Sequence, residues 1–262
     1  MDTEFELKEE RIQRELARFG RALPVELFAC IDSTNSEAKR RIASGDRRQQ
    51  LLLAEEQTAG RGRMGRSFFS PAETGLYMTL ILGQAQAMRD PAMLTVAAAA
   101  ATAGAIEEQT GTRTDIKWVN DIYMSGRKVC GILCEAVTDS AGRTTVLAGI
   151  GVNVVTEAFP EEIREKAGAL PVAVDRSALA AAITDRLLRI WEAPEDRTFL
   201  EFYRARSFVP GKRVVFLREG RELEALALAV DDSGALLVRY DDGREEALRS
   251  GEVSVRIDER QI

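Results

Sequence analysis

The sequence predicts an α+β fold in which helices flank a sheet that is at least partly antiparallel, with a smaller all-β unit near the C-terminus. The first observation is a set of three strand-like runs joined by short turns, which is the pattern of an antiparallel meander. These runs lie at 114–124, 129–138 and 145–154. The second is a change of texture at Pro210, after which short apolar runs alternate with Asp-Gly and Ser-Gly pairs, as in a small β-barrel. We therefore divide the chain into units at 1–208 and 209–262.

The other elements are predicted from apolar periodicity and from glycines that end helices. Phe5, Ile12, Leu16 and Phe19 recur at helical spacing among charged residues, and Gly20 is placed to end that helix. An alanine-rich stretch ends at a glycine, and its small side chains allow close packing. We expect helices at 5–19, from about 35 to 45, and at 91–110, 177–192 and 194–205, with additional strands at 26–31, 51–55 and 75–82.

Composition excludes several kinds of protein. The chain of 262 residues has no histidine, which excludes Ser-His-Asp and Cys-His catalytic centres. Its three cysteines form neither a disulfide framework nor, without histidine, a zinc site, and so favour a reducing compartment. The acidic N-terminus is unlike a signal peptide, and the alanine-rich stretch is too weakly apolar to span a membrane. With a net charge of −6, we expect a cytoplasmic protein that binds neither nucleic acid nor membranes.

Three arginines alternate with glycines in the run from Gly60 to Arg66. The string matches G-x-G-x-x-G, but a strand rather than a helix follows it and no acidic residue is placed for a ribose, so we reject a Rossmann site. Glycines let a backbone fold closely around an anion, and Arg61, Arg63 and Arg66 can supply charge-assisted bonds to phosphate or carboxylate. Ordering a glycine-rich loop costs conformational entropy, so we expect this loop to be mobile when the site is empty and to close over a bound ligand. A solvated basic turn or an RNA contact is the alternative.

A helix is predicted to begin within the run from Asp32 to Asn35. Glu37, three residues after Thr34, completes the pattern of a capping box. The N–H groups of a helix N-terminus, with the side chains of Ser33, Thr34 and Asn35, also suit a neutral polar ligand. The local pattern favours the cap and leaves the ligand site open.

Lys117, Asn120 and Asp121 lie within five residues at the end of a strand-like run. In a continuous strand, Lys117 and Asp121 point to one face and Asn120 to the other. A cation, an amide and a carboxylate at this spacing suit a nucleotide with its magnesium. The alternative is a surface strand with a structural Trp118.

Two glycine-containing runs follow. Lys128 comes after a tight turn, where it either reaches an acyl phosphate or forms a charged corner, while Cys130 and Cys134 suit small core positions. Glycines interrupt the strand at 149–154, which indicates the close approach of a ligand or another backbone and makes Asn153 a candidate nucleotide contact. No Walker A string occurs in the sequence, which argues against ATP binding of the P-loop kind.

Taken together, five motifs in this order resemble those of a biotin protein ligase. They are DSTN at 32–35, QTAGRGRMGR at 57–66, KWVND at 117–121, GRKVCGIL at 126–133 and GIGVNV at 149–154. Each is weak alone, but five in order, followed by a β-rich tail at 211–256, are specific. The resemblance implies a catalytic domain similar to class II aminoacyl-tRNA synthetases, with a mixed, largely antiparallel sheet, and an SH3-like C-terminal barrel.

The resemblance also implies roles for individual residues. Biotin would be bound by Ser33, Thr34, Asn35, Gln57, Arg61, Gly62, Arg63 and Lys128. ATP and the adenylate would be bound by Arg61, Arg63, Arg66, Phe68, Lys117, Asn120 and Asn153, with Asp121 as a magnesium ligand. Catalysis would rest on Lys128, Arg63 and Lys117.

The implied activity is that of a biotin–[acetyl-CoA-carboxylase] ligase, which converts biotin and ATP to biotinyl-5′-AMP and transfers biotin to a lysine of a biotin carboxyl carrier protein. The expected ligands are ATP, Mg²⁺ and biotin, and a homodimer is a further expectation because family members often pair. A lipoate protein ligase and a non-catalytic regulator that binds biotinyl-adenylate are the alternatives.

Three positions depart from the family pattern. Val119 stands where proline is usual, Phe68 where tryptophan is usual, and Met64 where a basic residue is usual. These changes concern the rigidity of one turn, the stacking of adenine and the affinity of the loop. Because one predicted helix precedes the first strand, we also expect no DNA-binding repressor activity.

Overall fold

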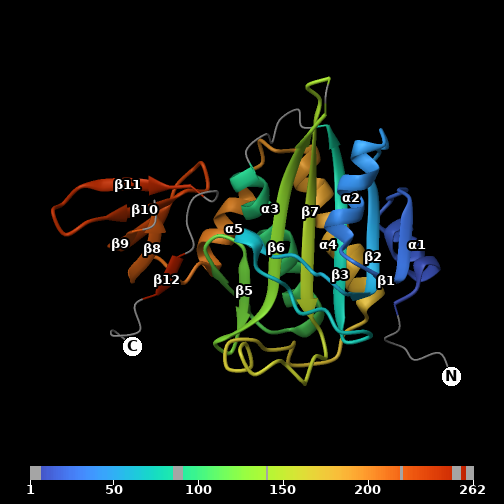
Figure 1. The fold of residues 1–262 in the computed structure, drawn as a ribbon, viewed down its shortest axis with the longest axis horizontal. Coiled ribbons are helices and arrows are strands. Elements are labelled where there is room, and N and C mark those ends of the chain that lie inside the picture. The colour runs from blue at the N-terminus through green and yellow to red at the C-terminus, as the bar shows by residue number, and fades with distance from the viewer. Residues whose placement is uncertain (1–6, 85–90, 140, 219–220, 250–254, 258–262) are drawn as a thin grey trace.

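Two separate sheets organise the chain (Figure 1). The computed structural model describes residues 7–84, 91–139, 141–218, 221–249 and 255–257. The elements are α1 (Glu9–Arg18), β1 (Val25–Ile31), α2 (Thr34–Ala43), β2 (Gln50–Gln57), η1 (Arg63–Gly65), β3 (Gly75–Gln84), α3 (Pro91–Thr110), β4 (Asp115–Lys117), β5 (Asp121–Met124), β6 (Arg127–Thr138), β7 (Thr144–Asn153), α4 (Arg176–Glu192), α5 (Thr198–Arg206), β8 (Arg213–Arg218), β9 (Arg221–Val230), β10 (Leu236–Arg239), β11 (Glu245–Leu248) and β12 (Val255–Ile257).

The main sheet is mixed and mainly antiparallel, as predicted. Its strand order is β1-β2-β3-β7-β6-β5-β4. β1 pairs with β2 in parallel, and every pairing from β2 to β4 is antiparallel. The smaller sheet, in the order β11-β10-β9-β8-β12, is antiparallel throughout. The predicted α+β fold with a β-rich tail is therefore confirmed.

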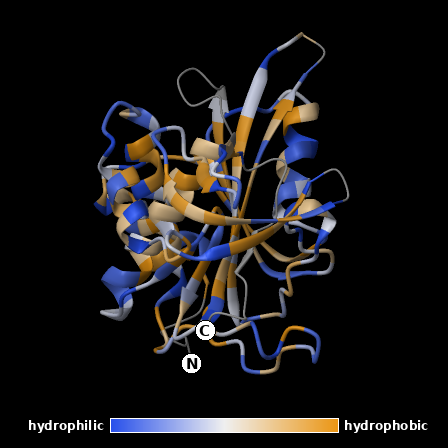
Figure 2. Cartoon of the chain, turned by 90° about the vertical axis from the view of Figure 1, so that its left-hand side faces the viewer, coloured by the Kyte–Doolittle hydropathy of each residue, from blue (hydrophilic) through white to orange (hydrophobic). Residues whose placement is uncertain are grey.

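Helices cover both faces of the main sheet, which explains why its strands are almost continuously apolar. Leu51 and Leu53 belong to the larger core, which also includes residues of α1, α3 and α4, whereas Leu52 belongs to a smaller core under Ile42 of α2. Successive strand residues point to opposite faces, so one strand supplies both cores. Figure 1 shows α2 in front of the sheet and α3 and α4 behind it. Figure 2 shows apolar residues following the central strands, with polar residues on the outer helix surfaces.

The predicted strand at 114–124 is wrong, because this segment is a hairpin of β4 and β5. Lys117 pairs with Asp121 across it, so the two side chains are cross-strand neighbours. Between them Trp118 and Val119 are both buried, at 4% and 0% exposure. The cross-strand pairing, rather than this burial, shows the turn, because strands of this sheet that are covered on both faces also bury successive residues.

The capping box is also wrong. Ser33 is the N-cap residue of α2, but its side chain makes no cap hydrogen bond. The Glu37 carboxylate instead pairs with Arg40 and Arg41 on the next turn. The helix N-terminus is stabilised from elsewhere: the backbone N–H of Thr34 donates to Oε1 of Gln57 at 2.9 Å. The local sequence pattern is therefore the pattern of a cap, but the partner comes from a different strand.

Three helix boundaries or faces differ from prediction. α1 begins at Glu9 and buries Ile12 and Leu16, while Phe19 is 42% exposed and Phe5 lies outside the described residues. α5 begins at Thr198 rather than 194.

Within the described residues, no helix combines the length and apolarity that a membrane crossing needs.

Candidate active site

A cavity of about 470 Å³ lies on the same face of the main sheet as α2. On β7 this face carries Leu147 under α2, and then Gly149, Gly151 and Asn153, which line the cavity. Every site residue that the sequence predicts lines it. They are Ser33, Thr34, Asn35, Gln57, Arg61, Gly62, Arg63, Arg66, Phe68, Lys117, Asn120, Asp121, Lys128 and Asn153. The volume falls within the range of small-molecule sites, about 300–1,000 Å³.

The glycines of β7 make room for side chains of the protein itself. A Cβ at Gly149 would lie 1.9 Å from Oδ1 of Asn35, and one at Gly151 would lie 2.5 Å from Cε1 of Phe68. The sequence predicted the approach of a ligand or another backbone here, and the structure places an amide and an aromatic ring at these positions. Any residue larger than glycine would displace them.

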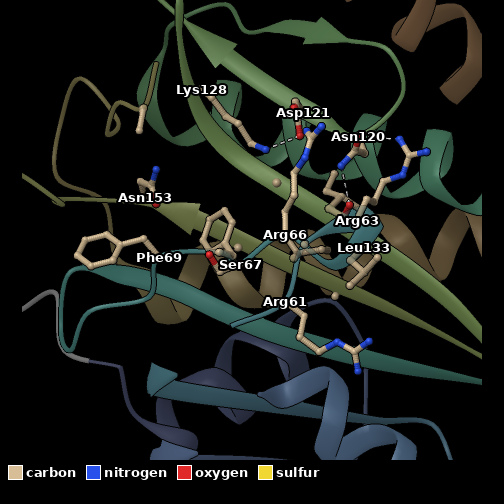
Figure 3. Close-up of a pocket in the computed structure, with 18 of the residues that line it drawn as sticks. Arg61, Arg63, Arg66, Ser67, Phe69, Asn120, Asp121, Lys128, Leu133 and Asn153 are labelled. Carbon is tan, nitrogen blue, oxygen red and sulfur yellow. Dashed lines mark hydrogen bonds and ion pairs between the residues drawn. The ribbon is translucent and has the colours of Figure 1, made fainter. Parts of the chain in front are cut away.

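The glycine-arginine loop folds back on itself beside this floor. The N–H of Gly62 donates to the carbonyl of Arg66 at 2.7 Å, and the N–H of Phe68 donates to that of Gly60 at 2.9 Å. The fold brings Arg63 against the β4–β5 hairpin, where its Nη1 donates to Oδ1 of Asn120 at 3.1 Å (Figure 3). The loop and the hairpin are thus joined directly.

Most of the positive charge of the cavity lies at its hairpin end. Six basic side chains line the cavity and Asp121 is the one acidic residue among its lining; the basic residues are Arg61, Arg63, Arg66, Lys117, Lys128 and Lys166. Arg61 alone points away from the hairpin, toward Glu135, with Nη2 4.0 Å from Oε1 (Figure 3). Nζ of Lys128 lies 2.6 Å from Oδ1 of Asp121 (Figure 3). Such an excess of cations attracts a polyanionic ligand.

Burial changes the titration of two of these cations. It lowers the pKa of Lys117, and although Asp121 opposes the shift, the charge of Lys128 adds to it. Burial also lowers the pKa of Arg63, again against the attraction of Asp121. Both side chains therefore have less water around their charges than exposed cations have, and an anionic ligand would interact with them strongly.

We call the opposite end of the cavity the neutral end, because the charge of Arg61, which lines it, is offset by the Glu135 carboxylate 4.0 Å away and its other groups are polar and uncharged. Oε1 of Gln57 accepts from the backbone N–H of Thr34 at 2.9 Å, and Nε2 of Gln57 donates to Oγ of Ser70 at 3.0 Å. Ser33 and Thr34 are both buried here, at 2% and 3% exposure. A ligand that fits this cavity has an uncharged polar group at one end and negative charge at the other.

Asn153 has a structural partner in addition to its place in the lining. Its Nδ2 donates to the carbonyl of Gly168 at 2.9 Å, and its carbonyl accepts from the N–H of Leu170 at 3.0 Å. It therefore holds the segment that follows β7 over the cavity. Phe159 of that segment packs against Phe69, with ring centroids 6.3 Å apart.

Among the residues in and around the site that the sequence interpretation missed, three bear on its polar contacts. Lys166 lines the cationic end, and its carbonyl accepts from the N–H of Lys128 at 2.8 Å. Thr79 and Glu135 contact Asn35 at the neutral end. Nothing in the sequence around these residues marks them, because their roles depend on which strands and segments become neighbours.

The side chains that could bind a metal ion can be compared with the expected magnesium site. Over the described ranges, no group of three or more Asp, Glu, His or Cys residues could hold a metal ion. Asp121 is a single carboxylate, paired with Lys128. Mg²⁺ at phosphate sites commonly binds one or two carboxylates together with substrate phosphates. The residues therefore fit Mg²⁺ only in the presence of a bound polyphosphate.

Comparison with known proteins now decides the family. A family model described as the biotin/lipoate A/B protein ligase family matches residues 27–154, and one described as the biotin protein ligase C-terminal domain matches residues 210–256. A biotin–[acetyl-CoA-carboxylase] ligase of Paracoccus denitrificans is 32% identical over 84% of this chain and 95% of its own length. The chain belongs to the biotin protein ligase family.

Other biotin protein ligases show the same relationship. The ligase of Mycobacterium tuberculosis is 32% identical over 87% of this chain and 88% of its own length. The bifunctional ligase/repressor BirA of Bacillus subtilis is 34% identical over 74% of this chain, which spans only 62% of that relative's length. The biotin protein ligase of Aquifex aeolicus, solved in complex with biotin and ATP, superposes with a TM-score of 0.75, at 26% identity over 90% of this chain and 99% of that one.

Proposed function

We propose that this protein is an ATP-dependent biotin–[acetyl-CoA-carboxylase] ligase. The observation that carries the proposal is that one cavity has both a neutral polar end and a cationic end. Biotin has an uncharged ureido ring at one end and a carboxylate at the other, and ATP adds three phosphates beside that carboxylate. The neutral end of the cavity therefore matches the ureido ring, and the cationic end matches the carboxylate and the phosphates.

The reaction has two steps. In the first, a carboxylate oxygen of biotin attacks the α-phosphorus of ATP, and the bond to the leaving pyrophosphate breaks. In the second, the ε-amine of an acceptor lysine attacks the acyl carbon of biotinyl-5′-AMP, the bond to AMP breaks, and the amine loses a proton. We propose a biotin carboxyl carrier protein as the acceptor. Neither step needs histidine, because phosphate supplies the leaving group.

The first step brings an anion to a polyanion, so the main task of the protein is to neutralise and align charge. We assign Arg63 and Lys128 to the carboxylate and the α-phosphate, between which the new bond forms. Lys117 serves the phosphates from the hairpin, and Asp121 would hold Mg²⁺, which would supply further positive charge to the phosphate oxygens. Arg61 and Gly62 cover biotin, while Arg66, Phe68, Asn120 and Asn153 contact the nucleotide.

Several finer expectations belong to the same proposal. We infer that the main sheet and its helices resemble class II aminoacyl-tRNA synthetases, that the smaller sheet is SH3-like, and that the two units divide at 208/209. A cytoplasmic location and a homodimer remain expectations, as does the lack of nucleic-acid and membrane partners. The matching C-terminal family model supports the second unit.

A transfer assay tests the function. The protein is incubated with ATP, Mg²⁺, biotin and a biotin carboxyl carrier domain, and the domain is weighed by mass spectrometry. We expect one added biotinyl group, and no adduct when lipoate replaces biotin. Lys128→Ala is the negative control: its circular dichroism should be native, and its pyrophosphate release should fall by about 10²–10³-fold, as for the loss of one transition-state donor. Transfer of lipoate alone would show that the rival activity is correct.

A further inference from the structure

Tyr123 lines the cavity beside the cations of the β4–β5 hairpin. It lies two positions after Asp121 in β5, so both side chains point to the cavity face of the strand, whereas Ile122 between them is fully buried. Across the sheet, Tyr123 pairs with Asp115 of β4 on one side and with Lys128 of β6 on the other. Tyr123 is therefore the cross-strand neighbour of the lysine assigned to the α-phosphate.

The hydroxyl of Tyr123 is available to a ligand. Among the residues that the structure describes, it has no hydrogen-bond partner. The ammonium of the neighbouring Lys128, by contrast, is already engaged, with Nζ 2.6 Å from Oδ1 of Asp121. Polar groups that are partly buried usually have a partner, so a half-buried phenol without one in the protein is a donor for a bound molecule.

The ring of Tyr123 is held by the segment that joins α5 to β8. It packs edge-on against Phe208, with ring centroids 5.6 Å apart and an interplanar angle of 69°. The N–H of Phe208 donates to the carbonyl of Ile116 in β4 at 3.2 Å, and Nζ of Lys212 lies 5.0 Å from the centre of the Phe208 ring. The hydroxyl is therefore positioned before a ligand binds, which lowers the entropic cost of a hydrogen bond to it.

The chemistry of the first step fixes where the leaving group must lie. In phosphoryl transfer, the attacking and leaving oxygens lie roughly in line with the phosphorus between them. In the proposed complex, biotin extends from Gln57 on β2 to the α-phosphate at Lys128 on β6, so pyrophosphate lies on the far side of that phosphorus. The strand order β1-β2-β3-β7-β6-β5-β4 places β5 next in this direction. Asp121 and Tyr123 are the residues of β5 that line the cavity.

We propose that the Tyr123 hydroxyl donates a hydrogen bond to the β- or γ-phosphate of ATP and so binds the leaving pyrophosphate. The inference rests on the proposed function and makes Tyr123 a further substrate-binding residue of the first step. Lys117 pairs with Asp121 across the hairpin and also lines the cavity. Lys117 and Tyr123 thus provide a charged and an uncharged donor for the same group of phosphate oxygens.

A contact to the leaving group serves only one of the two steps. Pyrophosphate forms when biotin attacks ATP, and it takes no part when the acceptor lysine attacks biotinyl-5′-AMP. Loss of the hydroxyl should therefore change the constants that involve pyrophosphate and leave the transfer step unchanged. A residue that only stabilised the hairpin would affect both steps, because Lys128 of the neighbouring strand serves the carboxyl and phosphate groups that the adenylate keeps.

Removal of the hydroxyl tests the contact. Tyr123→Phe keeps the ring against Phe208, and the deleted hydroxyl makes no hydrogen bond within the described protein, so the variant should fold normally by circular dichroism. The reverse of the first step is followed as ATP formation from biotinyl-5′-AMP, pyrophosphate and Mg²⁺. We expect the KM for pyrophosphate to rise about 10-fold or more, as for the loss of one hydrogen bond to a charged group. The KM for ATP should also rise in the forward direction, while transfer from added biotinyl-5′-AMP to a carrier domain should keep its wild-type rate.

Tyr240→Phe is the matched control. Tyr240 follows β10 in the C-terminal sheet and lies outside the cavity lining, and its hydroxyl donates to Oε2 of Glu246 at 2.8 Å. The same chemical change at this position should leave the KM for pyrophosphate, the KM for ATP and the transfer rate unchanged.

Two results would refute the role of Tyr123. One is a Tyr123→Phe variant whose KM for pyrophosphate equals that of the wild type, and the other is a variant that slows the transfer step as much as the first step. Either result leaves the proposed function intact, provided that the wild type forms biotinyl-5′-AMP. A wild-type protein that forms no biotinyl-5′-AMP would instead overturn the proposed function itself.

Discussion

Lys117 is the residue whose chemistry depends most on its surroundings. Burial lowers its pKa, and nearby cations lower it further. Its ammonium therefore loses its proton at a lower pH than the ordinary value of about 10.4 for an exposed lysine. If the ammonium binds ATP phosphates, that attraction is present below the lowered pKa and is lost as the pH rises through it.

We therefore predict that kcat/KM for ATP falls at alkaline pH earlier than an unperturbed lysine would require. Lys117→Arg should move this decline upward by at least one pH unit, because a guanidinium stays protonated across the whole range. The measurement is a profile of kcat/KM from pH 7 to 10.5 for both proteins. Coincident profiles would show that another group is responsible.

The predicted site residues were recognisable because they occur in short motifs with unusual composition. Arg63 and Lys128 stand among glycines in the sequence, and both do line the cavity. Thr79 sits within an ordinary apolar strand, and its hydroxyl reaches Asn35 because it faces Gly149 on a strand about 70 positions later. A single sequence does not reveal the register of two distant strands, so such partners stay hidden.

At the scale of elements, β7 acts as a floor with two separate places for side chains. Gly149 accepts the amide of Asn35 at the neutral end, and Gly151 accepts the ring of Phe68 nearer the nucleotide residues. The two glycines lie on the same face of one strand, two positions apart. Identical substitutions at the two positions should therefore have different consequences.

We predict that Gly149→Ala raises the KM for biotin by about 10-fold and Gly151→Ala raises the KM for ATP by a similar factor. In each case a methyl group would lie within 2.5 Å of the displaced side chain, a distance that forces it to move. Each variant controls for the other, since both add the same group to the same strand. Equal effects on both substrates would show general damage to the sheet, and would remove the support for Phe68 as an adenine contact.

The β4–β5 hairpin is an element that the sequence pattern does not predict. Alternating polar and apolar residues at 114–124 are typical of one strand, and the pairing of Lys117 with Asp121 is not visible in that pattern. What turns the chain is the burial of Trp118 and Val119 against distant groups. Nε1 of Trp118 donates to the carbonyl of Gly234 at 3.0 Å, and the hydroxyl of Tyr203 donates to that of Val119 at 3.1 Å.

At the scale of the whole molecule, these contacts connect the C-terminal sheet to the cavity. Gly234 lies in the turn between β9 and β10, and Trp118 lies between Lys117 and Asn120, which both line the cavity. Apolar side chains of both sheets form one continuous core, from Ile116 in β4 to Phe216 in β8. The C-terminal sheet thus contacts the hairpin that carries part of the cationic end.

We predict that Trp118→Phe, which keeps the aromatic packing but removes the donor, lowers kcat for adenylate formation by about 10-fold and raises the KM for ATP. The reason is that the Gly234 carbonyl loses its partner and the hairpin loses its fixed position, and small displacements of reacting groups are costly in rate. The KM for biotin should change less than 2-fold, because the neutral end is held by α2, β2 and β3. Trp191→Phe is the matched control, since Trp191 is the second of the two tryptophans and packs in α4 away from the cavity lining. Steady-state kinetics of the two variants give the comparison. Equal kinetic constants for both would mean that the C-terminal sheet contributes only to stability. A fall in kcat with a rise only in the KM for ATP, seen for Trp118→Phe alone, would mean that the sheet helps to align the nucleotide.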